Sequence, residues 1–179
     1  VNKMDLIKYR DKNLYFENVS VKTIAQKNIT PFFLYSFKQL ENNFKFFQNT
    51  FSKINPLICF SIKSNANLII LKKLKKLGSG ADVVSIGELQ LALKAGIDPQ
   101  KIVFSGVGKT KEELTYAISK KILLINTESE NEIDEIIKIA KNKKTTVKIG
   151  IRLNPNITGK TNKKISTGNK SDKFGVSLD

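Results

Sequence analysis

From residue 57 onward, short apolar runs alternate with longer segments in which apolar positions recur at helical spacing. The first pattern is typical of buried strands and the second of amphipathic helices. Strands are expected near 57–62, 81–85, 102–105, 122–126 and 146–153. Helices are expected near 67–77, 87–95, 111–119 and 130–141. Repeated strand–helix units of this length predict an α/β fold with a parallel sheet.

The ends of the expected helices carry boundary signals. Ser or Thr followed three residues later by Glu or Gln forms a capping box, and glycine is favoured just past a helix C-terminus. The sequence offers these signals as Thr110 with Glu113, Ser129 with Glu132, Gly78 and Gly96.

The N-terminal part has a less regular pattern. A strand is expected over 14–19, followed by a short helix capped by Ser20. Thr30-Pro31 then leads into a second expected strand, 32–35. The tail after Pro155 is polar and is expected to be a loop.

A longer helix is expected to follow these strands. Ser36 and Gln39 have capping-box spacing at its start. Apolar residues at helical spacing then predict one buried face, formed by Leu40, Phe44, Phe47 and Phe51.

Side-chain alternation within two expected strands bears on the architecture. One face of the last strand is apolar, and comprises Val147, Ile149, Ile151 and Leu153. The other face comprises Lys148, Gly150, Arg152 and Asn154. In the first strand of the series, Ser61 and Lys63 likewise share a face whose polarity rises toward Lys63. A (β/α)8 barrel combines an apolar outward face with chemistry at the carboxyl ends of its strands, so the pattern favours a barrel. An open doubly wound sheet is the alternative that this pattern leaves open.

Composition limits the class of protein. The chain has 179 residues, of which 40% are hydrophobic and 26% charged, enough for one domain with a core. It contains no apolar stretch long enough to span a membrane, and its first residues lack the apolar core of a secretory signal. The single cysteine, Cys59, fits a reducing compartment, so we expect a cytoplasmic protein.

The formal charge of +15 allows two interpretations. One is a basic nucleic-acid-binding protein. The other is a lysine-rich coding bias, which we favour because the densest run, Lys72–Lys76, is the polar face of an amphipathic helix without interleaved aromatic residues. We therefore expect neither a nucleic-acid nor a membrane partner.

Lys63 is the main candidate for chemistry. It follows an apolar run and precedes a helical one, which places it at the carboxyl end of an expected strand. An amine in such a position can form a Schiff base with an aldehyde. Partial burial and neighbouring cations would help to lower its pKa for that attack.

Six local sequences together carry a family resemblance. They are Phe60-Ser61-Ile62-Lys63-Ser64-Asn65, Asp82-Val83-Val84-Ser85-Ile86-Gly87-Glu88-Leu89, Ile102-Val103-Phe104-Ser105-Gly106-Val107-Gly108-Lys109, Arg152-Leu153-Asn154-Pro155, Ile165-Ser166-Thr167-Gly168 and Lys173-Phe174-Gly175. Each is a weak signal alone, but all occur in family order with family-like spacing. From Thr30 to Gly175 the chain resembles the diaminopimelate decarboxylases, which are fold-type III pyridoxal-phosphate enzymes.

The resemblance implies a partial (β/α)8 TIM barrel of the alanine racemase-like type, preceded by a short N-terminal β segment. Residues 1–29 would belong to a separate β-domain. Residues 30–179 would form the first part of the pyridoxal-phosphate-binding barrel.

The resemblance also assigns roles to individual residues. Lys63 matches the lysine that holds pyridoxal phosphate, and Asp82 matches an acidic residue close to that lysine. Arg152 matches an arginine near the cofactor ring or a substrate carboxylate, and an ion pair with Asp82 is a structural alternative for it. Glu88 matches a carboxylate near a substrate and dimer site. Ser85 and Asn154 are expected to be scaffolding.

The implied reaction is decarboxylation of meso-2,6-diaminopimelate to L-lysine by an enzyme that is a homodimer at full length. Other fold-type III decarboxylases, acting on carboxynorspermidine, ornithine or arginine, are the alternatives, together with alanine racemase. The racemase is disfavoured because Asn65-Ala66-Asn67-Leu68 stands where that family has Tyr-Gly.

The chain also departs from the family pattern. A complete barrel needs about 250 residues, and only five barrel strands are expected here. The family's glycine-rich phosphate loop is absent, and the chain has no histidine, with Asn162 at a position where one is common. A fragment, a decayed gene product and a chain completed by a second polypeptide are the three explanations. We expect little or no decarboxylase activity from these 179 residues alone.

Overall fold

The computed structural model describes residues 6–157, 167 and 174–177. The chain separates into two compact units, Val1–Pro56 and Leu57–Asp179. The expected assignment of 1–29 to a separate β-domain and of 30–179 to a barrel stays a prediction. No helix within the described ranges is both long and apolar enough to cross a membrane.

The first unit begins with a small antiparallel sheet in the order β1-β2-β3. Its strands are β1 (Ile7–Arg10), β2 (Asn13–Phe16) and β3 (Val19–Ser20), and α1 (Val21–Lys27) follows. The two-residue loop Asp11-Lys12 has positive φ at both residues, as the tight turn of a hairpin requires. The prediction of one strand over 14–19 was wrong, because a turn at Glu17-Asn18 divides this range into β2 and β3. Ser20 lies at the N-cap of α1, but its side chain makes no capping hydrogen bond.

Helix α2 (Phe37–Thr50) and the short 3-10 helix η1 (Ser52–Ile54) complete this unit. The Ser36 hydroxyl accepts from the Gln39 backbone N–H at 2.9 Å, which confirms the N-cap. The Gln39 side chain donates to Asn43 instead of returning to Ser36, so the expected capping box is one-sided. The expected strand 32–35 does not form, because these residues pair with no other strand.

The expected apolar face of α2 is only partly buried. Phe44 is 8% exposed, whereas Phe47 and Phe51 are 54% and 45% exposed. The rings of Phe47 and Phe51 stack on each other with centroids 6.4 Å apart. The prediction that both rings are buried was therefore wrong.

The second unit contains a five-stranded parallel sheet in the order β4-β5-β6-β7-β8. The strands are β4 (Cys59–Ser61), β5 (Gly80–Val83), β6 (Ile102–Phe104), β7 (Leu124–Thr127) and β8 (Ile149–Ile151). The helices between them are α3 (Leu68–Lys76), α4 (Ile86–Lys94), α5 (Lys111–Ser119) and α6 (Glu130–Asn142). Two 3-10 helices, η2 (Ile62–Ser64) and η3 (Pro99–Lys101), are also present. The strand–helix alternation expected from the sequence is confirmed.

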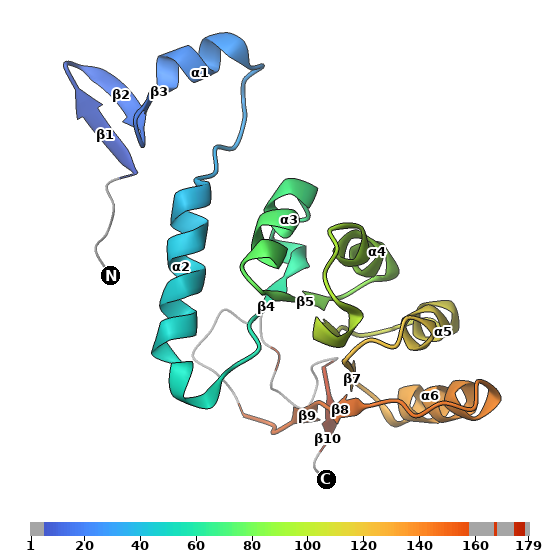
Figure 1. The fold of residues 1–179 in the computed structure, drawn as a ribbon. Coiled ribbons are helices and arrows are strands. Elements are labelled where there is room, and N and C mark those ends of the chain that lie inside the picture. Colours follow the sequence, from blue (N-terminus) through green and yellow to red (C-terminus); the bar gives the residue numbers. More distant parts are fainter. Residues whose placement is uncertain (1–5, 158–166, 168–173, 178–179) are drawn as a thin grey trace. The chain divides into compact units, whose positions relative to one another are not determined.

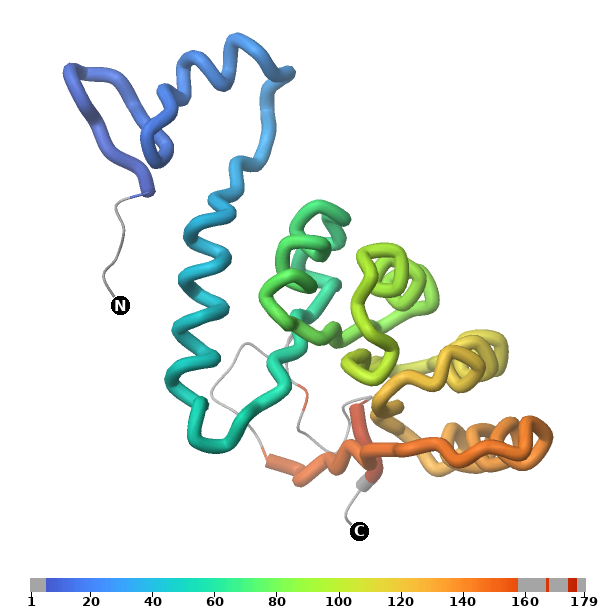
Figure 2. The backbone as a smooth tube through the Cα atoms, in the orientation of Figure 1, coloured from blue at the N-terminus to red at the C-terminus, as the bar shows by residue number. Residues whose placement is uncertain are grey.

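All four helices cover the same face of this sheet. Figure 1 shows α3, α4, α5 and α6 side by side, and each packs against the next. The backbone trace in Figure 2 returns from each helix to the sheet on the same side. A doubly wound sheet has helices on both faces. One-sided coverage is the arrangement of a barrel, so the open-sheet alternative is not supported.

Burial alternates along the strands in agreement with this arrangement. The outward face, toward the helices, carries Ala81, Val83, Ile102, Phe104 and Ile125, each at most 1% exposed. The opposite, inward face is half-buried and carries Asp82, Val103, Leu124 and Asn126. Apolar side chains thus form a core with the helices, while polar side chains gather on the inward face.

A separate two-stranded parallel sheet follows the five-stranded one. Arg152 separates β8 from β9 (Leu153–Asn154), and β10 (Val176–Ser177) pairs with β9 in parallel. The prediction that the tail after Pro155 is only a loop was therefore wrong for 176–177. Gly175 makes this pairing possible, since its φ is +78° and a Cβ there would lie 2.9 Å from the Arg152 carbonyl oxygen.

The boundary signals in the second unit are mostly confirmed. Thr110 and Glu113 form a reciprocal capping box at α5. Gly78 and Gly96 end α3 and α4 with φ of +93° and +83°. Ser129 caps α6, but the Glu132 carboxylate is engaged elsewhere, so the second expected box does not form.

Candidate active site

A row of polar side chains crosses the inward face near the carboxyl ends of the strands. The Asp82 carboxylate accepts hydrogen bonds from the Ser61 hydroxyl at 3.1 Å and the Ser105 hydroxyl at 2.7 Å. The Asn126 side-chain amide donates to Ser105 Oγ at 3.1 Å. Gly150 continues the row on the next strand, where a Cβ would collide with Asn126 Oδ1. Four strands therefore contribute to one hydrogen-bonded polar surface.

Lys63 lies just beyond this row. It belongs to η2, two residues after the end of β4, so strand parity does not determine where its side chain points. The expected position after the strand is confirmed, but the expected shared face of Ser61 and Lys63 does not follow from strand alternation, because β4 ends at Ser61. The side chain is exposed, and its amine makes no hydrogen bond or ion pair with any residue in the described part of the chain. The amine is therefore available to an external partner.

Asp82 has different partners from those expected. Its two oxygens are held by the hydroxyls of Ser61 and Ser105. Neither Lys63 nor Arg152 forms an ion pair with it in the described ranges. The carboxylate nevertheless influences Cys59, since burial and then the charge of Asp82 raise the pKa of that thiol.

Arg152 pairs with Glu128, which overturns the expected alternative of an Arg152–Asp82 ion pair. Arg152 Nη1 lies 3.1 Å from Glu128 Oε1, and the two side chains are 40% and 3% exposed. The guanidinium also lies over the Phe174 ring, 4.7 Å from its centroid. The Gly175 backbone N–H donates to Glu128 Oε2 at 3.0 Å. The Phe174-Gly175 pair thus docks on the Arg152–Glu128 ion pair.

The Glu88 carboxylate caps the N-terminal end of α4 in this structure. Its carboxylate accepts from the Val84 backbone N–H at 2.9 Å, while the Ser85 hydroxyl accepts from the Glu88 N–H at 3.2 Å. Glu132 repeats this geometry at α6, accepting from the Glu128 N–H at 3.1 Å. The repetition indicates a capping function. A role for Glu88 at a substrate or dimer site stays a prediction.

Three residues of the polar surface were not anticipated. They are Ser105, Asn126 and Glu128. The signal for two of them was present, because Leu124 and Asn126 alternate along the strand and Glu128 continues the same spacing just past its end. Ser105 gave no local signal, since it became a site residue only through its contact with Asp82.

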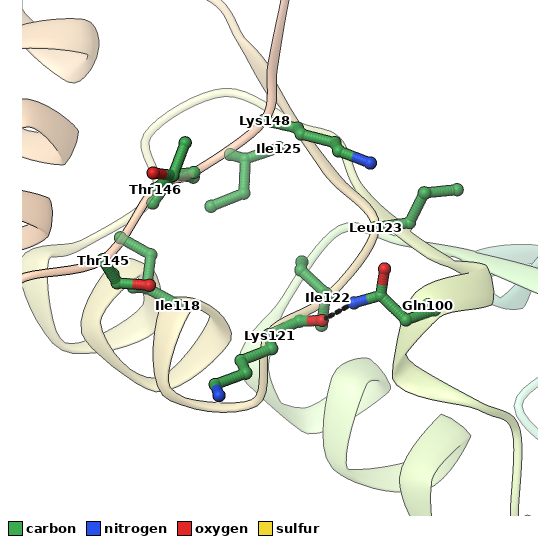
Figure 3. A pocket seen from close by; sticks show the side chains of 10 residues that line it. Gln100, Ile118, Lys121, Ile122, Leu123, Ile125, Thr145, Thr146 and Lys148 are labelled. Atoms are coloured by element: carbon green, nitrogen blue, oxygen red, sulfur yellow. Dashed lines mark hydrogen bonds between the residues drawn. The ribbon is translucent and has the colours of Figure 1, made fainter.

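A pocket of about 320 Å³ lies at the opposite end of the sheet (Figure 3). Its lining comes mostly from segments that precede the strands, including Leu123 before β7 and Thr145–Lys148 before β8, together with Ile118 of α5 and Ile125 of β7. The Gln100 side chain donates to the Lys121 carbonyl oxygen at its rim. In barrel enzymes chemistry occurs at the carboxyl end, so this pocket is separate from the candidate site.

Other residues of the resemblance fall outside the described ranges. Asn162, Ser166 and Lys173 are among them. Asn154 fits its expected scaffolding role, since it is 7% exposed and its side-chain oxygen accepts from the Asn156 N–H at 3.1 Å.

One-sided helices, a polar inward row and an available lysine at the carboxyl edge define a barrel-type α/β domain with a candidate site at that edge. The family described as pyridoxal-dependent decarboxylase, pyridoxal binding domain, matches residues 37–179, and the chain belongs to this family.

Particular relatives narrow the similarity further. The chain is 44% identical over 172 residues to the diaminopimelate decarboxylase of Aquifex aeolicus, with 96% of this chain and 40% of the relative covered. It is 51% identical over 147 residues to that of Helicobacter pylori strain J99, with 82% and 36% covered. The crystal structure of diaminopimelate decarboxylase from M. jannaschii in complex with L-lysine has a TM-score of 0.87 and 35% identity, with 96% of this chain and 41% of that chain covered. The chain thus spans about 40% of the length of such relatives.

Proposed function

We propose that this chain forms the lysine-bearing part of a pyridoxal-phosphate-dependent decarboxylase that converts meso-2,6-diaminopimelate to L-lysine. One observation carries the proposal. The Lys63 amine has no partner in the described residues, and Lys63 follows Ser61, a member of the preorganised polar row, by two positions at the carboxyl edge of the sheet. The relatives' shared name supplies the substrate.

The residues present fit pyridoxal phosphate. An unpaired primary amine is the group that an aldehyde cofactor requires, and Lys63 provides it. Asp82 would supply a negative charge whose position is fixed by Ser61 and Ser105. When bound, the cofactor supplies the electron sink for loss of carbon dioxide, and the protein supplies orientation and charge.

Arg152 would orient a carboxylate of the substrate or part of the cofactor. Glu128 and Phe174 fix the guanidinium on two sides, yet the side chain keeps 40% of its surface exposed. A planar guanidinium held in this way can still donate to a carboxylate. A homodimer, a contribution of Glu88 to its site and a cytoplasmic location belong to the same proposal.

Reductive labelling tests the assignment of Lys63. The purified chain is incubated with pyridoxal phosphate and reduced with borohydride, and the labelled peptide is identified by mass spectrometry. We expect the label mainly on Lys63, with loss in Lys63→Met and retention in Lys72→Met, which removes another exposed lysine. Label spread evenly over the surface lysines would contradict the proposal.

A hybrid enzyme tests the reaction. In it, this chain replaces the matching part of the Aquifex aeolicus relative. We expect release of L-lysine from meso-2,6-diaminopimelate, abolished by Lys63→Met, whereas the 179-residue chain alone produces little or none. A hybrid that instead decarboxylates ornithine, arginine or carboxynorspermidine would favour one of the alternative family members.

A further inference from the structure

Lys109 is a buried cation at the carboxyl end of the sheet that the proposed reaction does not use. Its side chain is only 1% exposed. The ammonium donates to the Gly106 and Asn126 carbonyl oxygens, each at 2.7 Å, and to Glu132 Oε1 at 2.6 Å. An ammonium has three donors, and all three are therefore used. A lysine held this fully has no capacity left for a ligand.

The loop before Lys109 is shaped to bring this amine inward. Gly106 and Gly108 have φ of +102° and +74°, values that side chains other than glycine's rarely adopt. A Cβ at Gly106 would also lie 3.3 Å from Val84 Cβ. The Gly106-Val107-Gly108 turn thus folds the chain back so that Lys109 reaches the neighbouring strand β7.

The Lys109–Glu132 ion pair holds the end of β7 and the residue after it at two points. Lys109 holds the carbonyl of Asn126, and the second oxygen of Glu132 accepts the Glu128 N–H at 3.1 Å. Asn126 and Glu128 are separated by one residue. The backbone that presents the Glu128 side chain is consequently fixed by charged groups rather than by strand pairing alone.

The Glu128 side chain connects this fixed backbone to Arg152. One carboxylate oxygen pairs with Arg152 and the other accepts the Gly175 N–H. Hydrogen bonds therefore run without interruption from Lys109 through Glu132 and Glu128 to Arg152. The nearby Lys111 offers a contrast, because it is 71% exposed and its nearest carboxylate oxygen is 3.8 Å away.

We propose that Lys109 and Glu132 are positioning residues, which set the direction of the Arg152 guanidinium through Glu128 and dock the Phe174-Gly175 segment. The positioning of Arg152 and of the Phe174-Gly175 segment is inferred from the hydrogen bonds and ion pairs described above. Its importance for the reaction rests on the proposed function, in which Arg152 orients a carboxylate.

Nuclear magnetic resonance on the full chain tests this positioning, with Lys109→Met compared with Lys111→Met. Amide exchange reports local opening separately from global unfolding. In Lys109→Met we expect exchange of the Glu128 and Gly175 amides to accelerate about tenfold, as for loss of a hydrogen bond to a charged group. The Arg152 Nε–H signal should shift as well. Lys111→Met should leave all three signals unchanged.

Two amides outside the hydrogen-bond network of Lys109, Glu132, Glu128 and Arg152 serve as internal references. These are Gly80, which donates to the Ile58 carbonyl at 2.9 Å, and Ile97, which donates to the Ala92 carbonyl at 3.1 Å. Equal acceleration at the references, or an unchanged Arg152 signal, would overturn the proposal. Should Lys109→Met fail to fold, Glu132→Gln provides the same comparison, since it keeps the size of the side chain and removes its charge.

Labelling of Lys63 separates this inference from the proposed function. Lys63 lies outside the network, so Lys109→Met should label normally with pyridoxal phosphate. Failure of the unmodified chain to label would count against the proposed function, whereas an unmoved Arg152 signal would count against the positioning role.

Discussion

Strands β7 and β8 are neighbours with the same apolar pattern, yet their outward faces differ in burial. Ile125 on β7 is 1% exposed, whereas its register partner on β8, Ile149, is 37% exposed. Ile151, two residues further along β8, is 54% exposed. Helix α6 follows β7, while no helix follows β8 within the described residues. An apolar stripe in the sequence thus specifies a surface that requires a partner, and burial depends on whether that partner is present.

The largest expected effect comes from truncating one isoleucine on each strand. Ile125→Ala should lower the free energy of unfolding by about 2–5 kcal/mol, because it leaves a cavity beneath the helices. Ile151→Ala should change it by no more than about 0.5 kcal/mol. Urea unfolding followed by circular dichroism measures both. Equal losses would mean that β8 is as well covered as β7.

A second pair of variants compares a hydroxyl of the inward polar row with an exposed hydroxyl at the end of helix α5. Ser105 follows β6 and links Asp82 to Asn126, so Ser105→Ala should destabilise the fold by about 1–2 kcal/mol. Ser119→Ala, which removes an exposed hydroxyl, should cost no more than about 0.5 kcal/mol. The same urea titrations apply. A loss at Ser105 no greater than that at Ser119 would show that the inward polar row adds nothing to stability.

The exposed apolar face of β8, formed by Ile149 and Ile151, can be altered directly. Ile151→Gln should reduce binding of the dye ANS and slow aggregation, because exposed contiguous apolar surface promotes both. The free energy of unfolding should stay within about 0.5 kcal/mol of the parent value. A large drop in stability would reveal that Ile151 packs more closely than its 54% exposure indicates.

The smallest expected effect concerns Cys59, on the inward side of β4. Burial and the Asp82 charge raise the pKa of this thiol, so the folded chain holds less thiolate than the unfolded chain at the same pH. Iodoacetamide at pH 8 should therefore react more slowly with folded than with urea-unfolded chain. Asp82→Asn should reduce this difference in reaction rate between the folded and unfolded chain, because it removes the second cause of the raised Cys59 pKa. The raised pKa also predicts that stability falls as pH rises above the thiol's unfolded pKa, since ionisation then favours the unfolded state.

Most of the second unit could be predicted from sequence because its signals are local. Apolar runs and capping residues such as Thr110 and Glu113 act within a few positions of each other, and they specified the strand–helix alternation. The direction of side chains at strand ends was harder. Lys63 turned out to lie in a 3-10 turn, where strand alternation no longer applies.

Contacts between distant residues could not be read from the sequence. Arg152 had Asp82 as an expected structural partner, but its partner is Glu128, which directly follows β7. This choice depends on register between β7 and β8, and register is decided by tertiary packing. Burial of a helix face also depends on tertiary packing. Helical spacing predicted that Phe47 and Phe51 are buried, although both rings are exposed.

The arrangement of helices along one face also has a consequence for how the chain folds. Each strand–helix unit packs against the unit just before it in sequence, as α3, α4, α5 and α6 do in order. Contacts between sequence neighbours carry a small loop-closure cost and form quickly. Each unit can therefore dock onto its predecessor as synthesis proceeds, in the way that a repeat array grows from a formed end. During such growth the strand added last always forms an edge of the sheet, as β8 does in the five-stranded sheet.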